Sequence, residues 1–177
     1  MSASTLDRVR RADALILTSL LWFMVLFLRY VLPPLFGRFQ VQYEVSRAEL
    51  GLAYSALMLA YSAVQFPAGW LADRLGMVRV IVGGAMVFGT ASLMISFSLS
   101  WYGMVAGLVL VGVGTGGHKT VSLPLLSDRY PRSPGRTLGL MDMVGQFGGV
   151  AGPGAVLVIA MLDFDWRIIF LFGGCVI

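Results

Sequence analysis

The stretch ALILTSLLWFMVLFLRYVLPPLF, residues 14–36, decides the fold class of this chain. It carries one charged side chain, Arg29, and exceeds the roughly 20 mainly apolar residues that a helix needs to cross a bilayer. Basic residues precede it, as in a signal peptide, but the run is too long for the apolar region of one, and no small-residue cleavage site lies before the next polar segment. We therefore expect a helix that stays in the membrane.

Similar apolar runs fill the rest of the chain. They cover residues 50–71, 80–99, 102–126 and 137–162, and a sixth occupies residues 168–177. Of the 177 residues, 58% are hydrophobic and 12% are charged, which is more apolar than a soluble core requires. Ten helical residues rise only about 15 Å, half of the hydrocarbon thickness, so the sixth helix is expected to be truncated. The sequence predicts an all-α membrane protein, with residues 14–177 as the transmembrane bundle.

The cations between these runs favour one side of the membrane. The richer side carries Arg8, Arg10, Arg11, Arg74, Arg79, Arg129, Arg132 and Arg136, whereas the other side carries Arg38, Arg47 and Arg167. Because lysine and arginine concentrate in cytoplasmic loops, we expect residues 1–13 to form a cytoplasmic N-terminus of a multi-pass plasma-membrane protein. The net charge of +4 is spread over short loops, so it indicates topology rather than a nucleic-acid partner.

Glycines cluster in the fourth and fifth runs with small-xxx-small spacing, which lets helix backbones approach closely in lipid. The pairs are Gly103 with Gly107, Gly112 with Gly116, Gly145 with Gly149, and Gly148 with Gly152. These pairs predict that both helices pack tightly within the bundle.

Two other patterns look like nucleotide sites but lack the required context. Residues 112–117 satisfy G-x-G-x-x-G, and His118, Lys119 and Thr120 follow as at the end of a phosphate loop, yet the segment lies inside an apolar helix with no preceding strand. The only histidine has no metal-ligand cluster in its neighbourhood, and Cys175 is a lone thiol suited to packing. We therefore predict no cofactor, no metal and no enzymatic activity.

The segment GWLADRLGMVR, residues 69–79, joins the second and third runs as a short charged turn. It resembles the signature loop of the major facilitator superfamily, in which glycines permit a sharp turn and an aspartate and arginines form a conformational latch between two helix bundles. The matching positions are Gly69, Asp73, Arg74, Gly76 and Arg79. Met77 and Val78 stand where many members carry further basic residues.

This resemblance implies a fold and a missing partner. The chain would be the N-terminal half of a transporter, a six-helix bundle built of two inverted three-helix repeats and truncated within its sixth helix. The C-terminal bundle would be absent from this chain. Membrane lipid and a small-molecule substrate would be its partners.

A second resemblance lies in the fifth run and is similar to the antiporter motif of the same superfamily. The matching positions are Gly139, Gly148, Gly152 and Pro153. A proline removes a backbone donor and kinks a helix, which a membrane tolerates where neighbouring groups satisfy the freed carbonyl. The closing glycine pair of the motif is replaced by Val156 and Leu157, so exchange with protons is only partly supported.

Four ionisable residues lie at membrane depth, where each charge costs at least about 2.5 kcal/mol, and they form the predicted substrate or ion cavity. They are Arg29, His118, Lys119 and Asp142. Lys119 and Asp142 lie at similar depths on glycine-bearing, protein-facing sides of their helices and are expected to pair. The pair is either structural or functional, and Lys119 could instead extend to the headgroups. Arg29 either faces the cavity or extends to the outer surface, and His118 either carries protons or bonds to backbone.

The predicted function is secondary transport of a small solute by alternating access, with an organic anion favoured by the cations. A proton-coupled drug or multidrug exporter is the alternative, supported by the helix 5 pattern and Asp142. Gly107 and Leu108 occupy the turn where many proton-coupled members carry an arginine, which argues against copying their coupling mechanism. A third reading is an inactive fragment, or a half-transporter that needs a partner chain.

Overall fold

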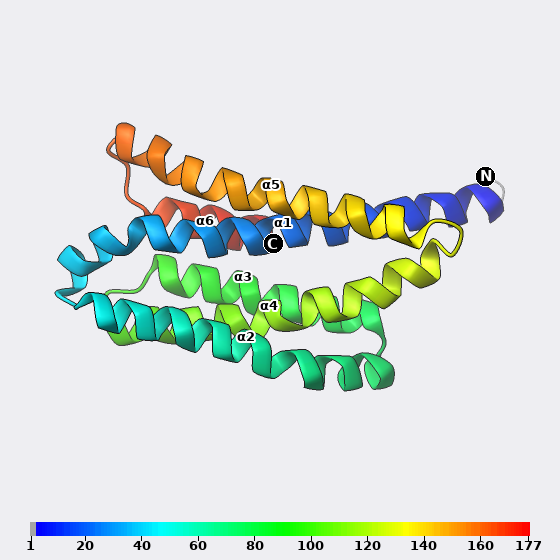
Figure 1. Ribbon diagram of the computed structural model, residues 1–177, viewed down its shortest axis with the longest axis horizontal. Helices are drawn as coiled ribbons and strands as arrows, with labels where there is room; N and C mark the ends of the chain where they lie inside the picture. The colour runs from blue at the N-terminus through cyan, green and yellow to red at the C-terminus, as the bar shows by residue number, and fades with distance from the viewer. Residues whose placement is uncertain (1–2) are drawn as a thin grey trace.

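The computed structural model describes the backbone of residues 3–177 and the side chains from residue 12 onward. Its helices follow one another along the chain, joined by short turns (Figure 1). They are α1 (Ala3–Tyr43), α2 (Arg47–Leu75), α3 (Met77–Ser96), α4 (Trp101–Arg129), α5 (Pro134–Met161) and α6 (Arg167–Val176). Within the described residues, five helices are long and apolar enough to cross a membrane, and α6 is a shorter apolar helix.

Local sequence explains where several helices begin. Ser46 caps α2 through a reciprocal pair of hydrogen bonds with Glu49, because the serine hydroxyl accepts from the Glu49 backbone and the glutamate accepts from the Ser46 backbone. Ser100 caps α4 by accepting from the backbone of Gly103. Pro134 begins α5 at a position where the missing N–H has no helical partner to lose.

The predicted ranges mark apolar composition rather than helix ends. α1 runs from Ala3 to Tyr43 and so exceeds the predicted range 14–36 at both ends. The predicted range 80–99 is wrong at its end, because α3 stops at Ser96. Phe97 and Leu99 are apolar, yet they are 70% and 90% exposed in the turn that leads to α4. Hydropathy alone does not detect such a turn.

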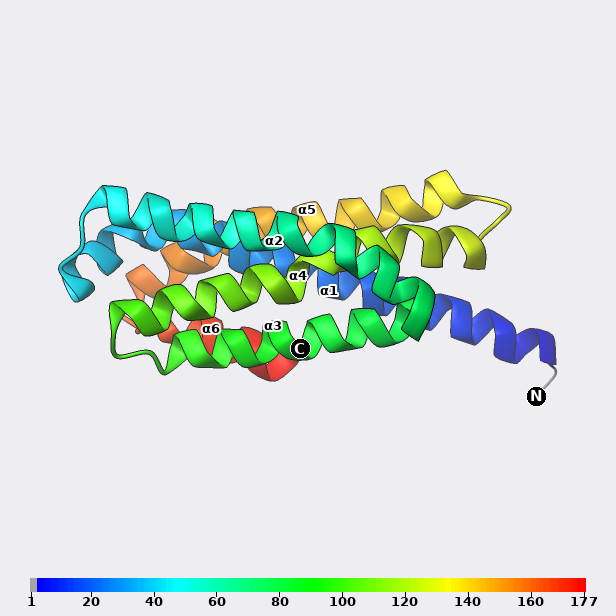
Figure 2. The same cartoon turned by 90° about the horizontal axis from the view of Figure 1, so that it is seen from below.

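The bundle consists of two closely packed groups of helices. α1 packs mainly on α5, α4 packs on both α2 and α3, and α6 packs on α3. In Figure 1, α1 lies beside α5 above α2, α3 and α4, and Figure 2 shows α6 on the same side of the bundle as α3, on which it packs. The pairing of α1 with α5 matches that of α4 with α2, as expected for inverted repeats of α1–α3 and α4–α6.

Glycine pairs bring two sets of helix backbones into direct contact. A Cβ atom at Gly112 or Gly116 of α4 would collide with the backbone carbonyls of Leu57 or Tyr61 of α2. A Cβ at Gly148 or Gly152 of α5 would likewise collide with the carbonyls of Phe23 and Phe27 of α1. The predicted tight packing of both helices is confirmed: α4 packs on α2 and α3, and α5 packs on α1, whereas α4 and α5 touch each other little.

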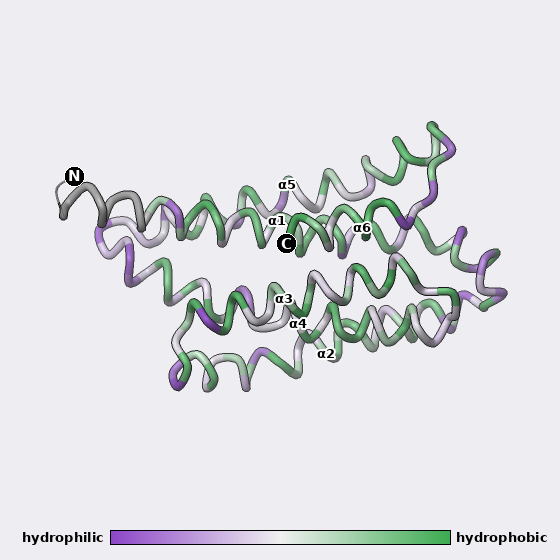
Figure 3. Tube along the Cα trace, turned by 180° about the vertical axis from the view of Figure 1, so that it is seen from behind, coloured by the Kyte–Doolittle hydropathy of each residue, from purple (hydrophilic) through white to green (hydrophobic). Residues whose placement is uncertain are grey.

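The outer surface of the bundle is apolar over most of its length. Hydrophobic residues cover the middle of the helices, and hydrophilic ones gather toward the ends and turns (Figure 3). Large side chains such as Phe66 and Val150 are exposed, which suits a surface that faces lipid. Inside, Phe39, Phe88 and Phe170 are fully buried and hold the helices together.

Candidate functional site

The candidate site lies along the boundary between the helix pair α1 and α5 and the helix triplet α2, α3 and α4. We call this boundary the seam. Few backbone contacts cross it, since α1 touches α2 and α4 only lightly and α4 touches α5 only lightly. All four ionisable residues predicted for the cavity form contacts across the seam, as the following paragraphs describe.

Lys119 and Asp142 link the two sides through an ion pair. The Lys119 ammonium donates to the Asp142 carboxylate over 3.0 Å and thereby joins α4 to α5. The predicted pairing is therefore present in the structure. The expectation that both residues face protein is only partly correct, because the two side chains remain 38% and 42% exposed. On the same faces of α4 and α5, the glycines pack against neighbouring helices. The Lys119 ammonium and the Asp142 carboxylate instead reach the edge of the seam.

His118 connects α4 to α1 in the interior. Its Nε2 atom lies 3.1 Å from the backbone carbonyl of Thr18, and its ring stacks on Trp22 with the centroids 5.9 Å apart. Only 6% of the His118 residue is exposed. This geometry matches the alternative in which the histidine bonds to helix backbone, and it makes His118 a packing contact between the two groups of helices.

Arg29 connects α1 to α2. Its guanidinium lies over the ring of Tyr61, 4.2 Å from the centroid, which is a cation–π contact. Its Nη2 atom is buried and has no hydrogen-bond partner among the residues that the structure describes. Arg29 therefore turns into the bundle rather than extending to the outer surface, and it keeps an unused charged donor there.

Trp22 occupies the centre of the seam and was not predicted from the sequence. Its ring contacts His118 and lies 5.2 Å from the Lys119 ammonium, and a Cβ at Gly145 of α5 would collide with it. Its indole Nε1 is a second buried donor without a partner in the described part of the chain. Helical spacing could have identified it, because Trp22 lies seven residues before Arg29 and Thr18 lies eleven before it, on one face of α1. Tyr61 had no comparable signal.

The loop between α2 and α3 forms the expected sharp turn through one of its two glycines. Gly76 has a φ angle of +93°, a conformation that other residues rarely adopt, and its N–H donates to the Ala72 carbonyl. Gly69 instead lies inside α2, within the apolar run predicted for residues 50–71. Arg74 stacks on Trp70 at 4.0 Å.

The two remaining latch residues lie on the surface at this end of the bundle. The Arg79 guanidinium donates to the Leu75 carbonyl over 3.3 Å and so satisfies a carbonyl at the C-terminal end of α2. Asp73 is exposed and makes no ion pair within the part of the chain that the structure describes. The latch between bundles remains a prediction.

The helix 5 pattern divides into packing and surface positions. Gly148 and Gly152 permit the close approach of α1, and Pro153 follows within a helix that continues to Met161. Gly139 has open space around it, because an added Cβ would meet no atom within 4 Å. Only the second half of the pattern therefore contributes to packing in this chain.

Comparison with known proteins agrees with this architecture. The sequence profile of the Major Facilitator Superfamily matches residues 15–177, which is most of the chain. The chain belongs to the Major Facilitator Superfamily. This membership agrees with the six-helix arrangement and its paired repeats, and with the signature loop.

Individual members of the superfamily with similar sequences differ in their named substrates. A probable sulfoacetate transporter of Cupriavidus necator is 29% identical over 75% of this chain and 31% of its own length. A multidrug resistance protein of Salmonella schwarzengrund is 31% identical over 75% of this chain and 34% of its own length. An uncharacterized transporter of Bacillus subtilis is 25% identical over 77% of this chain. The chain spans about a third of the length of the curated relatives it matches.

Proposed function

We propose that this bundle is part of a secondary transporter that moves a small organic anion by alternating access. The N-terminus would lie in the cytoplasm, as the arginine distribution favours. The substrate would bind between this bundle and a second one, against the seam. The loop of residues 69–79 would act as the latch that holds the two bundles in one state.

The observation that carries the anion proposal is the state of Arg29. Lys119 is already neutralised by Asp142 at 3.0 Å, so it offers little net charge to a substrate. Arg29 instead rests on Tyr61 with a buried, unpartnered Nη2 among the described residues. Guanidinium groups bind carboxylates, sulfonates and phosphates through charge-assisted hydrogen bonds. The name of the relative from Cupriavidus necator supports the same class, since sulfoacetate is an organic anion.

A second candidate is a proton-coupled exporter of drug-like amphiphiles. It is favoured by the half-exposed Asp142 carboxylate, whose protonation would release Lys119, and by the name of the multidrug resistance relative. In that case the Lys119–Asp142 pair would be the working group and Arg29 would only stabilise the bundle.

The deciding experiment is transport by the whole protein in proteoliposomes, with sulfoacetate and other small organic acids in one arm and cationic dyes in the other. Arg29→Ala removes a hydrogen bond to a charged group, so it should lower apparent anion affinity about 10- to 100-fold. Arg29→Lys should retain part of that affinity. Arg38→Ala is the matched control, since Arg38 lies on the same helix and its exposed guanidinium donates a hydrogen bond to the Phe164 carbonyl rather than facing the seam residues. Uptake of dyes that is lost in Asp142→Asn, with no anion transport, would overturn the proposal in favour of the exporter.

A further inference from the structure

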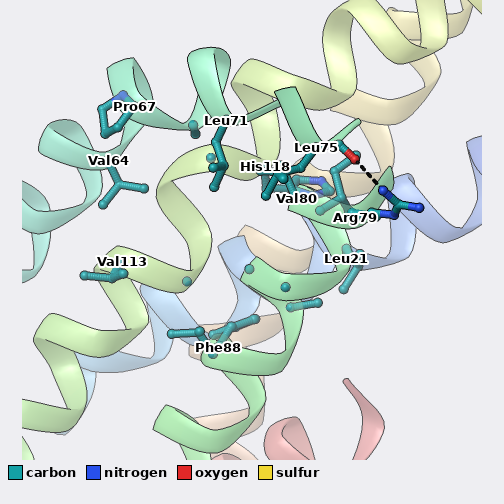
Figure 4. A pocket seen from close by; sticks show the side chains of 18 of the residues that line it. Leu21, Val64, Pro67, Leu71, Leu75, Arg79, Val80, Phe88, Val113 and His118 are labelled. Carbon is teal, nitrogen blue, oxygen red and sulfur yellow. Dashed lines mark hydrogen bonds between the residues drawn. The ribbon is translucent and has the colours of Figure 1, made fainter. Parts of the chain in front are cut away.

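A groove opens between α2 and α3, with α4 and part of α1 beneath it. Its lining includes Leu21 of α1 and His118, which also belongs to the seam (Figure 4). The groove encloses about 410 Å³. Pro67 and Leu71 of α2 form one wall and Gly83 of α3 belongs to the other, and all three are exposed. Figure 4 shows apolar side chains, among them Val64, around this cavity. The groove therefore opens on the outer surface of the bundle.

Small residues create this space. α2 and α3 contact each other only lightly, because α4 packs against both of them. At the floor, Gly114 packs so closely on Gly84 that a Cβ at Gly84 would lie 2.7 Å from the Gly114 carbonyl oxygen. Gly83, one position earlier, has open space, since an added Cβ there would meet no atom within 4 Å. The backbones of α3 and α4 therefore meet at Gly84, while the space beside Gly83 is free of protein atoms.

The groove is charged at one end and apolar at the other. Arg79 lies at the end next to the α2–α3 turn, and Phe88 and Val113 lie at the far end (Figure 4). Phe88 lies nine positions after Arg79 on α3, which corresponds to about 14 Å of helix, close to half of the hydrocarbon thickness. The groove therefore has the length of one acyl chain in one leaflet, with a cation at the level of the headgroup.

The cation is available to a ligand. One N–H of Arg79 donates to Leu75, and a guanidinium has five such donors. Arg74 adds a second positive charge beside the groove, because it stacks on Trp70, which lines the cavity. Asp73 is the competing anion on the same loop and leaves the three charges with a net value of +1.

We propose that this groove binds one acyl chain of an anionic phospholipid, with the lipid phosphate held by Arg79. The apolar lining accepts the chain, and the exposed walls let the lipid enter sideways from the bilayer. The positive end selects an anionic headgroup over a zwitterionic one, since a basic residue near the membrane surface attracts an acidic lipid. The lining of the groove contains neither Arg29 nor the Lys119–Asp142 pair.

The test is lipid binding to the purified whole protein, measured by native mass spectrometry with dioleoyl phosphatidylglycerol, dioleoyl phosphatidylcholine and glycerol 3-phosphate. Phosphatidylglycerol should bind about fivefold more tightly than phosphatidylcholine, and glycerol 3-phosphate should not compete, because the chain supplies most of the affinity. Arg79→Gln should reduce the preference to near unity while leaving phosphatidylcholine binding in place.

Gly83→Leu should lower the affinity for both lipids at least about tenfold, because the new side chain fills the groove without a backbone collision. Gly154→Leu is the matched control: it is the same substitution at another exposed helical glycine with open space, on α5. Equal binding by Gly83→Leu and the unmodified protein, or an equal loss in Gly154→Leu, would overturn the proposal. A preference for phosphatidylglycerol that persists in Arg79→Gln would also overturn the proposal. This second variant tests the proposal even if Gly83→Leu does not fold.

Discussion

The Lys119 ammonium lies 3.0 Å from a carboxylate oxygen of Asp142, and this ion pair is a direct bond between α4 and α5, two helices that otherwise touch little. Both side chains are about two fifths exposed, so the pair is neither fully desolvated nor freely hydrated. It closes one edge of the seam, while Arg29 and His118 cross the seam elsewhere.

Removing one partner of this pair should destabilise the bundle more than removing both. Lys119→Ala leaves a carboxylate at membrane depth, and Asp142→Ala leaves an ammonium there, whereas the double variant leaves neither. We expect a coupling of about 1 kcal/mol, between the values for exposed and buried pairs. Thermal unfolding in detergent should register it as about 2–4 °C of non-additivity in Tm.

The charge-swapped variant Lys119→Asp with Asp142→Lys is the control for that cycle. It keeps both charges at the same positions and should recover part of the lost Tm. The pair would contribute no interaction energy if the Tm losses of the two single variants added up to that of the double variant. The same would hold if the charge-swapped variant had a Tm as low as the less stable single variant.

The glycines of α5 should be intolerant of bulk only where they meet α1. Gly148→Leu places a side chain where the Phe23 carbonyl lies, so we expect a loss of at least about 3 kcal/mol and a poorly folded protein. Gly139→Leu, on the same helix, enters open space and should leave Tm within about 2 °C of the unmodified protein. Fluorescence-detected size exclusion would separate the two cases, and equal behaviour would contradict the packing assignment.

Tyr61 should act on substrate through Arg29. Tyr61→Phe keeps an aromatic face under the guanidinium, whereas Tyr61→Leu removes a cation–π contact of about 1 kcal/mol. Apparent affinity for the organic anion should therefore fall about fivefold in Tyr61→Leu and change little in Tyr61→Phe. A loss in both variants would indicate that the phenol hydroxyl matters instead. Unchanged apparent affinity in both variants would show that Tyr61 does not contribute to substrate binding.

Cysteine labelling in intact cells would test the proposed orientation. In a Cys175→Ser background, Arg132→Cys lies in the turn between α4 and α5, and Arg47→Cys lies at the start of α2, at the opposite end of the bundle. A membrane-impermeant maleimide should label residue 47 at once and residue 132 only after the cells are permeabilised. The reverse pattern would place the N-terminus outside the cytoplasm.

The sequence by itself determined the class of the protein and the candidate site residues at membrane depth. Long apolar runs predict spanning helices, because backbone groups in lipid must bond within their own helix. Charges at membrane depth are costly, which was enough to select Arg29, His118, Lys119 and Asp142, and the matched depths of Lys119 and Asp142 were enough to predict their pairing. Hydropathy did not give the helix ends, because a turn such as that at Phe97 can itself be apolar.

Only the tertiary structure decided what each charged residue touches. Partners of a buried side chain lie on other helices, and their choice depends on which backbones the glycines allow to meet, here α4 with α2 and α5 with α1. That packing placed Tyr61 under Arg29 and Trp22 between His118 and Gly145. It also left the groove beside Gly83 open, because two helices that both pack on α4 contact each other only lightly. Spacing along one helix fixes a face, but only packing fixes what that face meets.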